Sequence, residues 1–184
     1  MSKIITITIA MDLVEDGILG LNDPVTKYIP EFENLKVAVS KNGKVLSEIK
    51  IDDPALSISK AMTEEACPFK LVSTDSLMTV LHLLNHEAGF YYAKTNIYCL
   101  DSLLATKNLP TAKNSQELID LLAEMPLIQH PGTKHFYGTN TTVLGLVAER
   151  ATGKSLKQLV EERLTKPLGI NGLQYGLPPH TTLL

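Results

Sequence analysis

Apolar residues crowd the first stretch of the chain, from Lys3 to Asp16. Their spacing covers most faces of a helix, and Gly17 follows as a residue suited to a left-handed C-cap. We therefore predict a helix over residues 3–16 that is buried nearly all round and packs against later parts of the chain. The β-branched threonines and isoleucines within it weaken helix formation, so a buried strand remains the alternative interpretation.

The clearest β pattern comes next. Residues 35–40 and 44–51 both contain alternating apolar positions, which is typical of strands with one buried face. Asn42 and Gly43 stand between them, and this pair tolerates the positive φ angles of a type I′ turn. The pattern predicts a β-hairpin.

From Thr79 onward the apolar spacing is helical and is interrupted by capping residues, glycine and proline. Five helical segments are predicted, over residues 80–86, 97–106, 114–126, 141–153 and 155–167. The expected fold class is therefore mainly α with a small β-hairpin. No internal repeat or low-complexity linker interrupts the sequence, so we expect residues 1–184 to form a single domain.

Composition and charge exclude two classes of partner. The 184 residues carry a formal charge of -3, and no run of Lys or Arg could follow a phosphate backbone, so we exclude nucleic acid. The apolar start resembles a signal peptide only superficially, because Asp12, Glu15 and Asp16 interrupt it. No apolar run approaches the roughly 20 residues that cross a bilayer, so we expect a soluble chain without a membrane span.

The sequence contains two cysteines. Cys67 and Cys99 lack CxxC spacing and are interpreted as ordinary buried thiols.

Three blocks of sequence resemble one enzyme family. The first is residues 1–32, the second is 83–90 (LLNHEAGF), and the third is 131–169, which includes Pro131-Gly132-Thr133, Tyr137 and Glu149-Arg150-Ala151-Thr152-Gly153. The second block is similar to a Leu-Leu-Thr-His-Thr-Ser-Gly segment, with three changes. Together the blocks span nearly the entire chain. They resemble the serine β-lactamase-like and penicillin-binding-protein-like superfamily, in its class C β-lactamase and esterase branch.

The resemblance implies the helical lobe of an α+β fold, with most of the antiparallel sheet missing. It also implies hydrolysis of a small-molecule ester or amide through an acyl-serine intermediate, without a cofactor. Two catalytic residues follow: Lys3 as the amine of a Ser-x-x-Lys motif, whose members share one helix face, and Tyr137 as a second proton-transfer group. The family's Tyr-x-Asn pattern is not kept, because Thr139 holds the third position, and this favours the esterase branch.

The resemblance places the nucleophilic serine immediately before Met1, outside the 184 residues. Ser2 cannot replace it, because adjacent helical residues point about 100° apart. The family's Lys- or His-Thr-Gly strand would lie beyond Leu184. We therefore interpret the chain as truncated at both ends and expect it to be inactive alone. Two further Ser-x-x-Lys strings, 47–50 and 57–60, lack the buried helix that the motif requires.

Two alternatives from other functional classes stay open. The chain could be a non-catalytic remnant or binding module that contacts a partner through an exposed apolar surface. It could also be a zinc enzyme, because His82 and His86 stand four residues apart on a predicted helix, although Leu83 replaces the glutamate of the zincin pattern. Substrate, compartment and oligomeric state are left open by the sequence.

Overall fold

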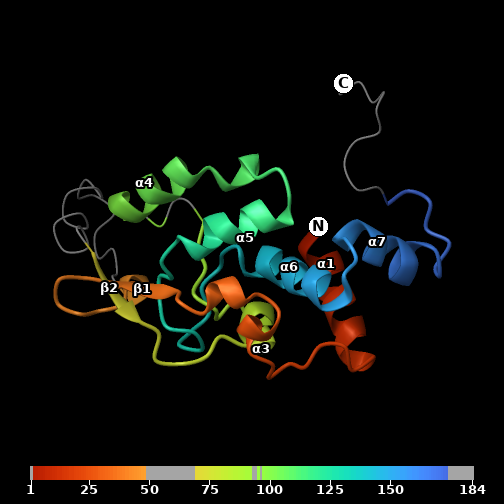
Figure 1. The fold of residues 1–184 in the computed structure, drawn as a ribbon, viewed down its shortest axis with the longest axis horizontal. Coiled ribbons are helices and arrows are strands. Elements are labelled where there is room, and N and C mark those ends of the chain that lie inside the picture. Colours follow the sequence, from red (N-terminus) through yellow and green to blue (C-terminus); the bar gives the residue numbers. More distant parts are fainter. Residues whose placement is uncertain (1, 49–68, 93–94, 96, 174–184) are drawn as a thin grey trace, which may run out of the picture.

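The computed structural model describes residues 2–48, 69–92, 95 and 97–173. Within these ranges the chain is mainly helical and carries a two-stranded antiparallel sheet. The sheet lies at one end of the elongated molecule and helices α1, α6 and α7 lie toward the other, with α4 and α5 above (Figure 1). The predicted fold class is confirmed. None of the helices in the described ranges combines the length and apolar content that a bilayer span requires.

Helix α1 spans Ser2–Glu15 and stops before Gly17, as predicted. Its buried residues lie on one side, namely Thr6, Ile9, Ala10 and Leu13. Ile4 and Met11 are 69% and 42% exposed, so the expectation of a helix buried nearly all round is wrong for the described residues. The physical reason is that α1 packs mainly against a single helix, α6, which covers one face.

The sheet pairs strand β1 (Lys36–Val39) with strand β2 (Lys70–Ser73), antiparallel and with Lys36 opposite Ser73. A turn forms at the predicted position, since the amide of Ser40 donates to the carbonyl of Lys44 at 2.8 Å and Gly43 has a φ of 82°. It is not the predicted type I′ turn, because Asn42 lacks the positive φ that this type requires at both central residues. Beyond a single Val39–Val45 bridge, however, the chain enters a 3-10 helix at Leu46–Glu48 instead of a second strand.

The other edge of β1 explains this departure from the predicted hairpin. The amide of Ala38 donates to the carbonyl of Leu127, and the amide of Leu127 donates to the carbonyl of Lys36. The amide of Ser47 donates to Ile128 in the same segment. Pairing with distant residues therefore replaces the local hairpin ladder. Residues 49–51 of the predicted strand lie outside the described residues.

The remaining helices are α3 (Val80–Leu84), α4 (Tyr98–Lys107), α5 (Ser115–Ala123), α6 (Asn140–Thr152) and α7 (Leu156–Val160). Helices α3, α5 and α7 begin at the predicted caps, whereas α6 begins at Asn140, just before the predicted start at Thr141 or Thr142, and α4 begins without a side-chain cap. Short 3-10 helices at Val25–Lys27, Pro30–Phe32 and Leu109–Thr111 connect them, and a π-helical turn at Glu161–Thr165 follows α7. Thr79 and Ser155 each form a capping box, and Asn114 caps α5 through the amide of Glu117.

Two clusters of buried side chains hold these elements together. The larger one joins α1, α3, α5 and α6 and includes Leu13, Leu83, Ile119 and Leu144. The smaller one lies between the sheet and α4 and is formed by Ala38, Leu46, Tyr91, Ile97, Leu100, Met125 and Ile128. Cys99, which packs against the smaller cluster, is disulfide-bonded, so its interpretation as an ordinary thiol is wrong. Cys67 lies outside the described residues.

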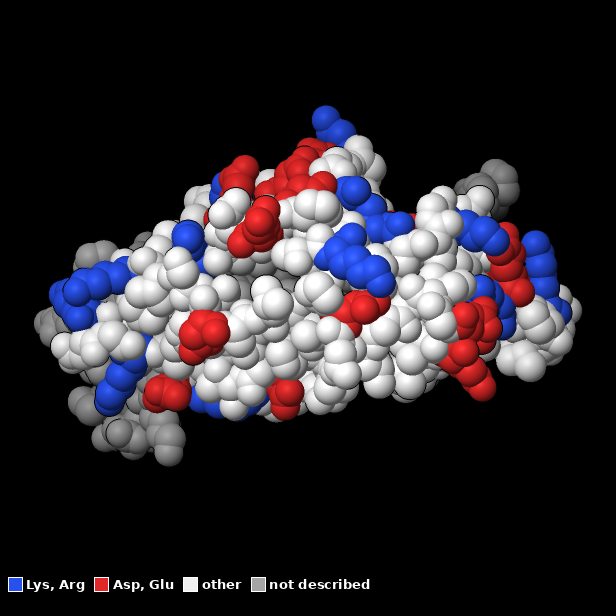
Figure 2. Space-filling view, turned by 60° about the horizontal axis from the view of Figure 1, so that its bottom comes forward, with Lys and Arg blue, Asp and Glu red and all other residues white. Residues whose placement is uncertain are grey.

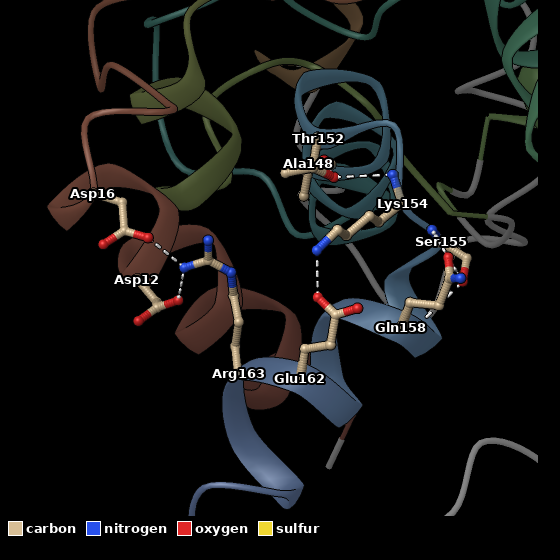
Figure 3. Close-up of polar contacts among 9 residues, drawn as sticks. All are labelled: Asp12, Asp16, Ala148, Thr152, Lys154, Ser155, Gln158, Glu162 and Arg163. Atoms are coloured by element: carbon tan, nitrogen blue, oxygen red, sulfur yellow. Dashed lines mark hydrogen bonds and ion pairs between the residues drawn. The ribbon is translucent and has the colours of Figure 1, made fainter.

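Ion pairs fasten the π-helical turn to α1 (Figure 3). Arg163 donates from Nη1 to Asp12 and to Asp16, each at 2.6 Å, and Lys154 forms an ion pair with Glu162 beside them. Partly exposed pairs of this kind each stabilise a fold by at most about 1 kcal/mol. On the face seen in Figure 2, acidic and basic side chains are interspersed and separated by broad uncharged surface.

Candidate active site

The structure brings the two predicted site residues, Lys3 and Tyr137, together. Lys3 lies in the first turn of α1, and its ammonium group lies 5.1 Å from the centroid of the Tyr137 ring. The same nitrogen donates a hydrogen bond of 2.7 Å to the hydroxyl of Tyr92 and lies 5.1 Å from that ring as well. A cation held between two phenol rings gains cation–π attraction from both. The amine is thus fixed in place.

Tyr137 lies in the loop that precedes α6, and its ring contacts two aromatic side chains. Its ring stacks on the imidazole of His86, with 5.0 Å between centroids and 25° between planes, and meets Tyr92 at 5.6 Å in a tilted arrangement. The side chain nevertheless stays 57% exposed. Its position is therefore defined by neighbours while part of its surface remains open to a ligand.

Gly138 explains how this loop approaches the tyrosine pair. A Cβ atom added at Gly138 would lie 2.0 Å from the carbonyl oxygen of Phe90 and 2.7 Å from the Cα of Tyr91. Only a residue without a side chain permits such close contact between two backbone segments. The contact places Tyr137 beside Tyr92, although the two residues are far apart in the sequence.

His86, on which the Tyr137 ring stacks, is itself held in place by α6. Its Nδ1 lies 3.2 Å from Nδ2 of the buried Asn140, and its Nε2 lies 3.3 Å from the hydroxyl of Thr141, so α6 holds both ring nitrogens. Burial lowers the pKa of His86, and the positive charge of Lys3 lowers it further, followed by His135. The imidazole is therefore held in its neutral form at neutral pH.

This arrangement bears on the zinc hypothesis. Nδ1 of His82 accepts a hydrogen bond from the amide of Thr79 at 3.3 Å as part of the α3 capping box. The ring nitrogens of His86 are engaged with α6. Among the residues that the structure describes, no group of three His, Cys, Asp or Glu side chains could hold a metal ion. Both histidines thus form hydrogen bonds with neighbouring residues, and this geometry does not support the zinc hypothesis.

We predict that removal of the Lys3 charge will raise the pKa of His86. In the parent chain, NMR titration of the imidazole should give a value below the ordinary 6.5. In Lys3→Ala the value should rise but stay below 6.5, because the contribution of burial remains. Lys113→Ala removes a charge that does not act on His86 and is the matched control. An unchanged His86 titration in Lys3→Ala would show that the amine does not lie near the imidazole.

A cavity of about 610 Å³ opens beside Lys3, and it has both charged and apolar walls. Its lining includes Lys3, Lys113, Glu149, Thr141 and Tyr92. This volume is within the range of small-molecule sites. Ser2 also lines the cavity.

The structure describes only part of the two other Ser-x-x-Lys strings. Ser47 belongs to the 3-10 helix beside the sheet, and Lys50 and residues 57–60 lie outside the described residues.

Tyr92 is the site residue that sequence reasoning did not single out. The sequence shows only two consecutive tyrosines after Gly89, either of which could line a cleft or pack the loop. Tyr91 packs: it is 4% exposed, burial raises its pKa, and its hydroxyl has no hydrogen-bond partner among the described residues. Tyr92 is the residue that faces Lys3. No local pattern in the sequence separates the two tyrosines.

Comparison with known proteins identifies the family of the chain. The Beta-lactamase family model matches residues 1–182. The chain is 30% identical to a lovastatin esterase of Penicillium rubens over 95% of its length, and 26% identical to the acyltransferase mokF of Monascus pilosus over its full length. It superposes on unliganded simvastatin synthase (LovD) from Aspergillus terreus with a TM-score of 0.64 and 26% identity over 91% of the chain.

The chain corresponds to only part of the length of these relatives. The chain spans 38% of the esterase, 38% of the acyltransferase and 36% of the synthase. The family match, by contrast, extends over nearly all of the 184 residues and includes both Lys3 and Tyr137. The chain belongs to the beta-lactamase family, in its branch of esterases and acyltransferases.

Proposed function

We propose that this chain carries the proton-transfer half of a serine hydrolase that cleaves small esters or amides through an acyl-serine intermediate. The observation that supports the proposal is the placement of the Lys3 ammonium nitrogen between the rings of Tyr92 and Tyr137. The similarity to an esterase and to an acyltransferase supports the same class of chemistry.

The chemistry needs a hydroxyl to lose its proton as it attacks a carbonyl carbon. Lys3 would act as the base partner of the serine, and Tyr137 would pass the proton to the oxygen or nitrogen of the leaving group. Water or a second alcohol would then release the acyl group by the reverse sequence.

The serine of this proposal occupies the position immediately before Met1, three residues from Lys3 on the same helix face. The 184 residues by themselves are therefore expected not to turn over substrate. The backbone amide of that serine would be one donor of the oxyanion hole.

The experiment begins with the coding DNA just upstream of Met1. We expect an in-frame serine codon there, and the extended polypeptide should form an acyl-enzyme with p-nitrophenyl butanoate, detected by mass spectrometry. Lys3→Ala should lower acylation by at least about 1000-fold, because base and nucleophile act as a unit. Lys41→Ala, which removes an exposed lysine that does not line the cavity, should keep it within about threefold.

Two results would contradict the proposal. A stop codon directly upstream of Met1 would remove the acyl-serine mechanism and favour a non-catalytic module. A burst of p-nitrophenol from the purified 184-residue chain, abolished by Lys3→Ala, would show that the nucleophile lies within the chain after all.

A further inference from the structure

A second cavity, of about 450 Å³, opens next to the first and has a different chemical character. Its walls come from α4, the 3-10 helix at 109–111, α5 and the start of α6. The apolar lining residues are Leu104, Ala105, Leu109, Pro110, Leu118 and Leu122, and the polar ones are Tyr92, Asn108, Thr139 and Thr142. No charged side chain is among the described residues that line it. We call it the apolar cavity.

The apolar cavity adjoins the cavity beside Lys3. Tyr92, Leu109, Pro110, Leu118 and Thr142 line both. Tyr92 is the most informative of these, because its hydroxyl receives the hydrogen bond from Lys3 while its side chain also lines the apolar cavity. A molecule whose polar end lies at Lys3 can therefore extend past Tyr92 into apolar surroundings.

We propose that the apolar cavity binds the aliphatic chain of the acyl group that is transferred. The proposal rests on the function proposed above and adds the substrate class to it. A charged or polyhydroxylated group would lose its hydrogen bonds to water there without replacement, because leucine, alanine and proline offer no side-chain donors or acceptors. An alkyl chain loses nothing and gains from leaving water. The cavity is at the smaller end of small-molecule sites, which suits a chain of short to medium length.

The size of the effect follows from the burial of methylene groups. Each methylene that leaves water should tighten binding about fourfold, until the cavity is filled. Straight-chain carboxylates are suitable probes, because the carboxylate can pair with the Lys3 ammonium while the alkyl chain reports on the apolar cavity. A plot of binding free energy against the number of methylenes then separates the two contributions. The slope measures burial of the alkyl chain in the apolar cavity, and the intercept measures pairing of the carboxylate with Lys3.

The experiment measures binding of butanoate, hexanoate and octanoate to the purified 184-residue chain by isothermal titration calorimetry. In the parent chain we expect roughly fifteenfold tighter binding for each added pair of methylenes. Ala105→Phe places a ring into the cavity from an exposed position on α4 and should abolish this gain. Thr106→Phe adds the same ring at the adjacent exposed residue, which does not line the cavity, and should leave the gain unchanged.

The outcomes separate this inference from the proposed function. Lys3→Ala should weaken all three probes by a similar factor and keep the dependence on chain length. A parent chain whose affinity does not rise with chain length, or an Ala105→Phe variant that keeps the rise, would overturn the assignment of the cavity. Neither result would touch the acyl-serine proposal, which depends on the upstream codon and on the Lys3-dependent acylation.

Discussion

Gly138→Ala is expected to lower the free energy of unfolding by at least about 3 kcal/mol. The new methyl carbon would meet the carbonyl oxygen of Phe90 at 2.0 Å, and this contact is with the backbone, which cannot turn aside as a flexible side chain can. Urea denaturation followed by far-UV circular dichroism measures the change, since the chain contains no tryptophan for fluorescence.

The matched control is Gly172→Ala, where an added Cβ meets nothing within 4 Å. This variant should stay within about 0.5 kcal/mol of the parent. Equal stability of the two variants would mean that the backbone around Tyr137 does not approach residues 90 and 91 as closely as the structure shows.

Leu13→Ala should destabilise the fold by about 3 kcal/mol, within the usual range of 2–5 for a fully buried leucine. Leu13 is 0% exposed and lies in the larger cluster where α1 packs on α6. The substitution removes apolar contacts and leaves a cavity that rigid helices fill only in part. Chemical denaturation of the purified variant provides the measurement.

Met11→Ala is the companion variant on the same helix. Met11 is 42% exposed, so its truncation should change the free energy of unfolding by less than about 1 kcal/mol. If the two substitutions had equal effects, the one-sided burial of α1 would be wrong, and the prediction from sequence of a helix covered on every side would be restored.

Local signals account for most of the helices that could be predicted from sequence. Thr79, Asn114 and Ser155 each accept the hydrogen bond that their position at a helix start predicts. The hairpin was only partly predictable, because turn chemistry at Asn42 and Gly43 is local whereas the choice of a strand partner is not. Competition from Leu127 and from β2 decided it, and no local pattern reports such distant partners.

The candidate site shows the same division between local and distant information. Lys3 and Tyr137 were identified from motifs, and the structure places them side by side, but their catalytic roles remain a prediction. Tyr92 could not be ranked above Tyr91 without the fold, because only the loop around Gly138 determines which phenol faces the amine. The apolar cavity is built from α4, α5 and α6 together, so it has no signature in any one stretch of sequence.

His86 combines two demands that oppose each other. Its backbone adopts a φ of 57°, a conformation that is unfavourable for most side chains and that glycine or asparagine adopts at lower cost. Replacement by either would relax the turn after α3, yet it would also remove the ring on which Tyr137 rests. A substitution at this position that eases the backbone would therefore leave the phenol of Tyr137 without its stacking partner.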